Sequence, residues 1–213
     1  MDWPELRQGL IDAGRRMNAS GINRGQAGNL STRVPDGFLI TPTGMAYDEL
    51  RPDDIVLIAL DGAMAEGQRR PSSEWLFHRD IYRARADSGA IVHLHSPHAT
   101  ALACTRRGIP AFHYMIAEAG GVDIRCAEYA TFGTQALADA AVAALADRQA
   151  CLLANHGMIT LGRDIDSALE LAHAVEDLAR QYCITLQIGG PVIIDAAEMR
   201  RILKKFEDYG RQD

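Results

Sequence analysis

The stretch at residues 89–105, GAIVHLHSPHATALACT, constrains the fold more than any other part of the chain. Its first half is apolar and rich in β-branched residues, which is typical of a buried strand, and the half after Pro97 has helical spacing. A second apolar run, ACLLANHG at residues 150–157, ends in a glycine turn. These runs predict one α/β domain over residues 1–213, with strands and helices mixed along the chain.

Periodicity predicts the other elements. Apolar residues at helical spacing predict helices at 5–19, after the Pro-Ser-Ser start at 71–73, at 134–145 and, longest of all, at about 164–188. Short β-prone runs lie in GFLITPTG and DIVLIAL. The segment NRGQAGNLS, with two glycines three positions apart, predicts a loop. The order of the strands in the sheet does not follow from this pattern.

Composition excludes several classes of function. The net charge is −6, which argues against a nucleic-acid partner, because such binding needs a surplus of basic residues on one face. The start MDWPELRQGL lacks the basic and apolar pattern of a signal peptide, and no apolar run reaches the length of a membrane span. The four cysteines form no C-x-x-C motif, which suits a reducing compartment. The sequence therefore predicts a cytoplasmic protein without a membrane partner.

Three histidines follow the first buried strand. His93 and His95 are two positions apart, so on a strand they point to the same face and can converge on one ion. An H-x-H pair alone is also compatible with polar residues at a strand end. His98 lies beyond Pro97 and need not share that face, so we interpret it as structural or as a support for the other two.

His156 adds a third candidate ligand. It follows the second apolar strand and precedes Gly157, where tight backbone geometry can direct a side chain out of the sheet. Two histidines on one strand and one on another form a set of three imidazoles. That set is typical of catalytic zinc with an open coordination position, whereas structural zinc sites are closed by four protein ligands.

Small and hydroxyl-bearing residues predict an anion site. Ser72 and Ser73 lie at an expected helix N-terminus, where free N–H groups and the helix dipole favour an anion. Glu74 is expected in the first helical turn, and the same three residues are compatible with a simple helix cap. The segments GQAGN and TPTG are loops whose backbone N–H groups can bind phosphate oxygens. Together these features predict a phosphate pocket beside a metal and a carboxylate.

These segments resemble the family of class II aldolases and adducin heads, and within it most closely the L-fuculose 1-phosphate aldolases. The resemblance rests on AGN, LITPTG, PSSEW, VHLHSPHATA, IPAFHYMIAEAGG, YATFGT, NHG and KFEDYG, which occur in the family's order and spacing from about residue 20 to the end. It implies a single α/β domain whose central sheet is mostly antiparallel and is flanked by helices. It also implies assembly into a homotetramer with active sites at the subunit interfaces.

The resemblance further implies the roles of individual residues. Zinc, or another divalent transition metal, is expected on His93, His95 and His156, with Glu74 close enough to bind it in the resting state. Tyr114 is expected to reach the active site of a neighbouring subunit. The phosphate of the substrate is expected to contact Gly28, Asn29, Thr43, Gly44, Ser72 and Ser73. The aldehyde end of the substrate is expected to contact Phe132, Phe206 and Tyr209.

The implied reaction is the reversible cleavage of a ketose 1-phosphate to dihydroxyacetone phosphate and a short aldehyde. The expected substrates are of the L-fuculose, 5-deoxyribulose or methylthioribulose 1-phosphate type. Glu74 would move the proton at C3, and Tyr114 would exchange the proton on the aldehyde oxygen. The chain departs from its relatives at Gln26, where a threonine is usual, and at Asn155, where a second histidine is common.

Three alternatives belong to the same family. A ribulose-phosphate 4-epimerase would use the same metal and bond cleavage but retain and rotate the aldehyde. A methylthioribulose-phosphate dehydratase is disfavoured by the segment HYMIAEAGG. A non-catalytic adducin-like interaction head is disfavoured because the three histidines and the glutamate are all present.

Overall fold

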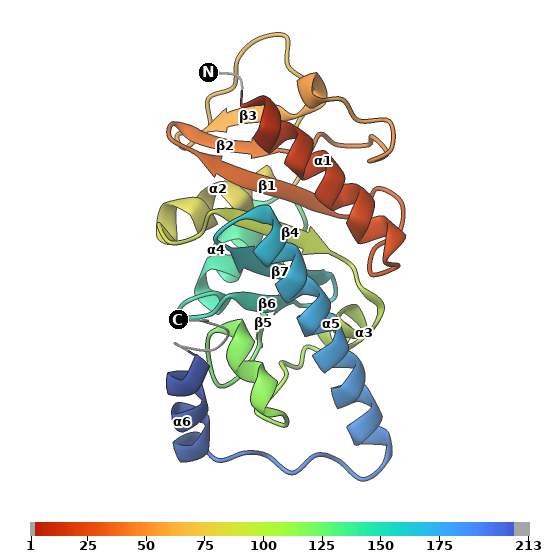
Figure 1. Ribbon diagram of the computed structural model, residues 1–213, viewed down its shortest axis with the longest axis vertical. Helices are drawn as coiled ribbons and strands as arrows, with labels where there is room; N and C mark the ends of the chain where they lie inside the picture. Colours follow the sequence, from red (N-terminus) through yellow and green to blue (C-terminus); the bar gives the residue numbers. More distant parts are fainter. Residues whose placement is uncertain (1–2, 207–213) are drawn as a thin grey trace, which may run out of the picture.

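One seven-stranded sheet runs through the molecule in the order β3-β2-β1-β4-β7-β6-β5 (Figure 1). The computed structural model describes residues 3–206. The strands are β1 Asn29–Val34, β2 Gly37–Ile40, β3 Val56–Ala59, β4 Ala90–Leu94, β5 Arg125–Ala127, β6 Ala150–Leu153 and β7 Gly157–Gly162. All neighbouring strands are antiparallel except β5 and β6, which are parallel. The predicted α/β fold with a mostly antiparallel sheet is confirmed.

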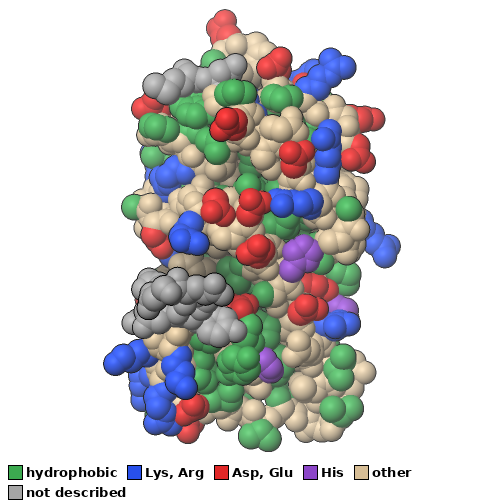
Figure 2. All heavy atoms as spheres, viewed as in Figure 1, with side chains coloured by type: hydrophobic (Ala, Val, Ile, Leu, Met, Phe, Trp, Pro, Cys, Tyr) green, Lys and Arg blue, Asp and Glu red, His purple; other side chains and the backbone are tan. Residues whose placement is uncertain are grey.

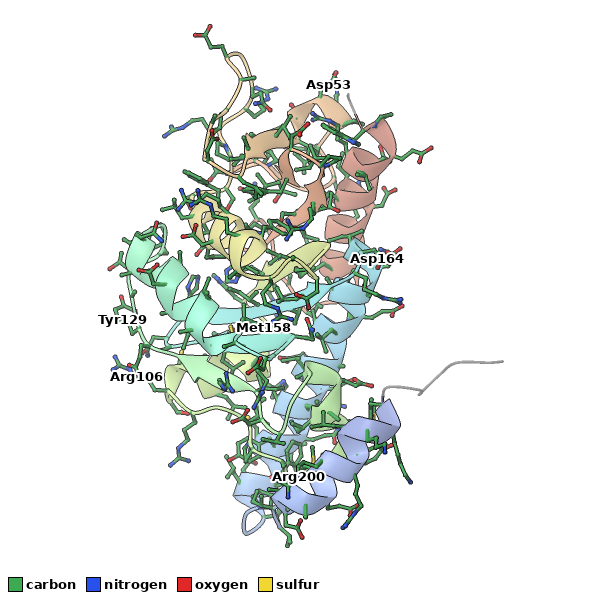
Figure 3. The ribbon with its side chains drawn as sticks, turned by 90° about the vertical axis from the view of Figure 1, so that its left-hand side faces the viewer. Asp53, Arg106, Tyr129, Met158, Asp164 and Arg200 are labelled. Carbon is green, nitrogen blue, oxygen red and sulfur yellow. The ribbon has the colours of Figure 1, made fainter. Side chains whose placement is uncertain are left out.

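Helices cover both faces of the sheet. The helices are α1 Pro4–Ala19, α2 Trp75–Ala84, α3 Pro97–Cys104, α4 Gln135–Ala144, α5 Ile165–Gln187 and α6 Ala196–Phe206, with short 3-10 helices η1 Pro52–Asp54 and η2 Tyr114–Ala119. Helices α1, α3 and α5 bury their apolar side chains against one face. Helices α2 and α4 pack on the other face, so the sheet lies between two helical layers, as the side view in Figure 3 shows. Each layer has its own hydrophobic core.

The predicted helices agree closely with the observed ones. Helix α5 begins where Asp164 accepts a hydrogen bond from the backbone N–H of Ser167, a capping box that satisfies otherwise unpaired donors. Thr134 caps α4 in the same way, through the N–H of Leu137. Helix α6, strand β5 and η2 were not predicted. Within residues 3–206, the helices are all too short or too polar to cross a membrane.

The loop prediction for NRGQAGNLS was wrong at its end. Asn29 already belongs to β1, which pairs with β2 on one side and with β4 on the other. In β1, Leu30 and Val34 are buried in the core beneath α1. Asn29 and Ser31 face α2 and are buried there as well. The sequence pattern misses this strand because a strand with polar side chains on a buried face lacks the usual hydrophobic signal.

Candidate metal centre

Three histidines converge at one end of the sheet. His93 is in β4, His95 follows that strand by one residue, and His156 lies in the turn between β6 and β7. One ring nitrogen from each lies within 4.8 Å of the others. The Nε2 atoms of His93 and His95 are 3.1 Å apart. The structure therefore brings together the three imidazoles that strand alternation and the glycine turn predict.

The turn before β7 fixes the position of His156. Asn155 adopts a left-handed backbone conformation with φ of 54°, which asparagine tolerates better than most residues. Its backbone N–H donates to Ala103 at 3.0 Å, which ties the turn to the end of α3. A side chain at Gly157 would lie 2.6 Å from the carbonyl oxygen of Leu94 and 2.7 Å from the ring of His95. Only glycine lets the two strand ends approach this closely.

Hydrogen bonding and burial prepare the imidazoles for a metal. The Nδ1 atom of His93 is 2.9 Å from the carbonyl oxygen of Met158, which is labelled near the middle of Figure 3. A carbonyl only accepts, so Nδ1 carries the proton and Nε2 presents a lone pair to the cluster. Burial, and then the neighbouring His93, lower the pKa of His95 and of His156 to about 4. Both rings are therefore neutral near pH 7, as metal ligands must be.

Glu74 lies directly beside the cluster. Its Oε2 is 3.2 Å from Nε2 of His93, and its Oε1 is 3.3 Å from Nε2 of His156. Burial raises the pKa of this carboxyl, but the adjoining imidazoles of His93 and His156 and the side-chain amide of Asn29 outweigh burial and lower the pKa to about 2. Glu74 is therefore ionised near neutral pH. Within residues 3–206, its Oε1 is buried without a hydrogen-bond partner.

The expected place of Glu74 in the first turn of the helix needs a small correction. Helix α2 begins at Trp75, and Glu74 occupies the position just before it. Its side chain makes no capping bond, because the carboxylate is directed toward the histidines and Asn29. Ser72 and Ser73 lie in the turn ahead of the helix, where the hydroxyl of Ser72 accepts from the N–H of Glu74 at 3.3 Å.

The donor set fits a divalent cation. The Nε2 lone pair of His93 faces the Oε2 of an ionised Glu74, and the Nε2 of His95 lies 3.1 Å away. The His93 Nε2 and the Glu74 Oε2 are both acceptors, and acceptors this close repel one another unless a cation lies between them. Three imidazole nitrogens and one carboxylate suit zinc and neighbouring transition metals better than calcium or magnesium. These four side chains could therefore hold a metal.

His98 does not belong to this cluster. Its Nδ1 lies 2.7 Å from the Oε1 of Glu176, a residue of α5. The same carboxylate accepts from the hydroxyl of Ser96 and from the backbone N–H groups of His98 and Ala99. An anion at this position caps the first turn of α3. The interpretation of His98 as a structural residue agrees with these contacts.

Two of the expected phosphate loops lie side by side. The backbone of Pro42 pairs with that of Pro71, and the N–H of Ser72 donates to the carbonyl of Thr41 at 3.1 Å. Gly44 has φ of 70° and open space around its α-carbon, as a phosphate-binding turn requires. Ser73 is likewise exposed.

The remaining two expected phosphate residues lie closer to the histidines. A side chain at Gly28 would lie 2.8 Å from the carbonyl oxygen of His93, so the loop comes within contact of the metal-binding strand. Asn29 is buried, and its side-chain amide donates to Glu74 Oε2 at 3.0 Å. The structure thus gives Asn29 a contact with the carboxylate that the sequence did not reveal.

A pocket of about 260 Å³ opens beside the cluster. Its walls come from Ser73, Glu74, His95, Tyr129, Ala130, Phe132, Asn155 and His156. Phe132, which was expected to contact the aldehyde end of the substrate, is one of these wall residues. Arg106, to which the sequence pattern assigns no role, packs over the ring of Tyr129 and donates to Asn155 at 3.0 Å. Figure 3 shows Arg106 and Tyr129 together at the edge of the molecule.

The other expected residues lie elsewhere. Tyr114 begins η2, and its ring packs near that of Phe206 in α6, with the centroids 6.5 Å apart. Neither residue lines the pocket of its own chain. Tyr209 lies outside the described residues.

The model of the family described as "Class II Aldolase and Adducin N-terminal domain" matches residues 8–183. The chain belongs to this family. Class II aldolases are metal-dependent, and the three converging imidazoles are the site that such a dependence requires.

Named relatives of this class II aldolase span almost the whole chain. A 5-methylthioribulose-1-phosphate/5-deoxyribulose-1-phosphate aldolase of Rhodospirillum rubrum is 56% identical, over 96% of this chain and 92% of that protein. An L-fuculose phosphate aldolase of Escherichia coli is 46% identical, over 99% of this chain and 98% of that protein. A solved structure of an L-fuculose 1-phosphate aldolase matches with a TM-score of 0.92 and 40% identity, covering 95% of this chain and 96% of that one. The chain is accordingly placed among the aldehyde-lyases of its family.

Proposed function

We propose that the chain is a zinc-dependent aldolase that reversibly cleaves a ketose 1-phosphate to dihydroxyacetone phosphate and a short aldehyde. The observation that carries the proposal is the position of the ionised Glu74, within 3.3 Å of two of the three converging imidazoles. Proton transfer at a carbon next to a carbonyl requires a positive charge and an acid–base group, and this site combines a metal-binding cluster with a carboxylate. The names of the relatives favour aldol cleavage over epimerisation and dehydration.

The chemistry assigns each group a task. The C4 hydroxyl gives up its proton, which we assign to Tyr114 of a neighbouring subunit, as C4 becomes the aldehyde carbon; breaking the C3–C4 bond leaves an electron pair on C3, beside the C2 carbonyl. A divalent metal, when bound by the histidines, supplies the positive charge that stabilises this developing anion. Glu74 delivers a proton to C3 in cleavage and removes it in the reverse reaction. Residues 28–29, 43–44 and 72–73 hold the phosphate, so that C3 lies within reach of Glu74.

We place this reaction in the cytoplasm and assign it to residues 1–213 acting as one catalytic domain. The four cysteines are free, as a reducing compartment favours. No nucleic acid or membrane takes part in the proposal, and the partner of the chain is the phosphorylated sugar.

We also propose a homotetramer in which each active site is completed by a neighbouring subunit. Tyr114 is 48% exposed and lies beside Phe206, away from the pocket that both are expected to serve. Figure 2 shows hydrophobic side chains gathered over η2, beside α6. After α5, Ile188 and Val192 are also largely exposed. Apolar surface of this kind marks a protein interface, which would carry both aromatic residues to the neighbouring site.

Subunit mixing tests this arrangement. Tyr114→Phe and Glu74→Gln homotetramers are each expected to be nearly inactive. After exchange of subunits between them, some interfaces combine an intact Glu74 with an intact Tyr114, so part of the activity returns. Sedimentation analysis before and after mixing should show tetramers throughout. If the mixed tetramers are no more active than the two parents, each site is built within one chain.

Selectivity is expected to differ between the two ends of the substrate. Removing the phosphate leaves several hydrogen-bond donors unpaired, so free dihydroxyacetone should be a very poor donor. Around the aldehyde, Tyr129 and Phe132 offer mostly apolar contacts. Such walls separate aldehydes that differ by one methylene by only ~10- to 200-fold.

A panel of ketose 1-phosphates tests both the function and this selectivity. Substrates that yield lactaldehyde, glycolaldehyde, acetaldehyde and methylthioacetaldehyde are compared by kcat/KM, with release of dihydroxyacetone phosphate as the readout. We expect several to be cleaved. Cleavage of one substrate alone, or comparable kcat/KM in the condensation direction with unphosphorylated dihydroxyacetone, contradicts the assignment of the two ends.

A further inference from the structure

Five polar residues form a buried row between β1 and α2. Asn29 and Ser31 are two positions apart on β1, so they share the face of the strand that meets α2. Glu74, just before α2, and His78 and Tyr82 within it follow one another at intervals of four, so they lie along one side of the helix. All five are buried to at least nine-tenths. The strand and the helix thus interlock through polar side chains in a region that is otherwise hydrophobic.

These five residues form one continuous chain of hydrogen bonds. The Tyr82 hydroxyl lies 2.8 Å from Ser31 Oγ, and Ser31 Oγ lies 2.7 Å from His78 Nδ1. His78 Nε2 lies 2.6 Å from Asn29 Oδ1, and the Asn29 amide nitrogen lies 3.0 Å from Glu74 Oε2. This hydrogen-bond chain therefore connects Tyr82, near the end of α2, to the carboxylate of Glu74 beside the histidine cluster.

The amide of Asn29 determines the direction of every donor. Its N–H donates to Glu74 Oε2, so its Oδ1 faces His78. Oδ1 only accepts, so His78 carries its proton on Nε2 and accepts at Nδ1 from the Ser31 hydroxyl. Ser31 in turn accepts from Tyr82. All four hydrogen bonds point toward Glu74, and each donor polarises the next.

His78 is the residue on which this direction depends. It is fully buried, and burial lowers its pKa to about 3, so it is a neutral ring with one proton. If that proton moved to Nδ1, two acceptors, Nε2 and Asn29 Oδ1, would face each other at 2.6 Å. The Ser31 hydroxyl prevents this by donating to Nδ1. Phe77 stacks on the ring of His78 and contacts His93 edge-on, which holds the ring in place.

We infer that His78 is a positioning residue for the proposed proton transfer, acting through Asn29 to hold the carboxylate of Glu74 in one orientation. In this orientation Asn29 donates a hydrogen bond to Oε2, and Oε1 has no hydrogen-bond partner within residues 3–206. Oε1 is therefore the oxygen that takes the proton from C3, while the electron pair of the C–H bond stays on the carbon. The inference rests on the proposed role of Glu74 as the acid–base group.

Three variants separate positioning from general stability. His78→Leu removes both hydrogen bonds of the ring. His78→Gln retains an amide N–H near the place of Nε2 and can still donate to Asn29. Ser31→Ala removes only the hydroxyl that fixes the tautomer, and this small change offers a test even if His78→Leu does not fold. Ile81→Ala is the matched control, because Ile81 is buried on the same helix and its side chain takes no part in the hydrogen-bond chain.

The assay is the exchange of the C3 proton of dihydroxyacetone phosphate with D2O, followed by NMR in the zinc-loaded protein. It isolates the Glu74 step because no aldehyde is needed. We expect His78→Leu to slow exchange by about 10- to 100-fold with zinc content unchanged, as is typical for groups that orient a metal-site residue. Ser31→Ala should slow exchange several-fold, and His78→Gln should be faster than His78→Leu. Crystal structures of the variants should show Glu74 turned away from Asn29 wherever exchange is slow.

Several results would overturn the inference. If the exchange rate falls no further in His78→Leu than in Ile81→Ala, or is normal in Ser31→Ala, the hydrogen-bond chain has only a structural role. Loss of zinc from His78→Leu, with exchange following zinc content, also contradicts it. If the unaltered protein catalyses no exchange, the proposed function itself fails. The crystal structures then still decide whether His78 orients Glu74, because an unmoved carboxylate in His78→Leu contradicts the inference independently of activity.

Discussion

Replacement of Glu74 by glutamine is expected to reduce turnover by about a hundredfold or more while the metal stays bound. Glutamine keeps the shape of the side chain, and its carbonyl oxygen can still accept from Asn29. An amide cannot take up and return a proton, so the step at C3 loses its acid–base group. Three imidazoles remain to bind zinc, and for this reason we expect zinc content to be maintained. The measurements are kcat and zinc content on the same sample.

Glu170→Gln is the matched control for this prediction. Glu170 is an exposed glutamate of α5, so the same change of charge should leave turnover unaffected. One alternative result for Glu74→Gln would assign Glu74 another role. If Glu74→Gln loses zinc, and its residual rate simply follows the zinc that remains, then Glu74 is a metal ligand and not the group that transfers the proton.

The histidine cluster could be predicted because its geometry is local. Side chains two positions apart on a strand point to the same face, whatever the rest of the fold. This alternation predicts that His93 and His95 lie together. The position of His156 depended on a glycine turn, which the structure explains by the close approach of Gly157 to His95. Asn155 fits the left-handed conformation that the turn requires.

Strand β1 could not be predicted because its function conflicts with the usual hydrophobic pattern. Asn29 and Ser31 occupy positions on a buried face that apolar residues would normally fill. They are polar because they belong to the hydrogen-bond chain that ends at Glu74. Such conflicts between a local rule and the fold are expected at functional sites. The spacing of Glu74, His78 and Tyr82 was visible in the sequence, but its meaning required knowing which strand packs against that helix.

Other parts of the site depend on contacts that are distant in sequence. The order of the strands is set by long-range pairing, such as that of β4 with β7, and periodicity does not contain it. The separation of Tyr114 and Phe206 from the pocket of their own chain is likewise invisible in the sequence. Only the resemblance to the family indicated that a second subunit would use Tyr114.

Removal of the metal is expected to abolish activity and to leave the fold largely intact. The three histidines lie at the ends of neighbouring strands in a sheet that is covered by two hydrophobic cores, so we expect the domain to fold without the ion. The ion is needed at the carbanion step, and the ionised Glu74 and neutral imidazoles do not replace its positive charge. Circular dichroism should therefore change little after chelation, whereas turnover should fall to background. Zinc added back should restore turnover at about one ion per chain.

The central claim, a metal-dependent cleavage of a ketose 1-phosphate, is tested most directly by one measurement. Dihydroxyacetone phosphate released from 5-deoxyribulose 1-phosphate is quantified for the zinc-loaded protein, the chelated protein and the chelated protein with zinc restored. The account predicts release with the first, background levels with the second and recovered release with the third. Full release by the metal-free protein, or none from the zinc-loaded protein with this or any other ketose 1-phosphate of the panel, would contradict it.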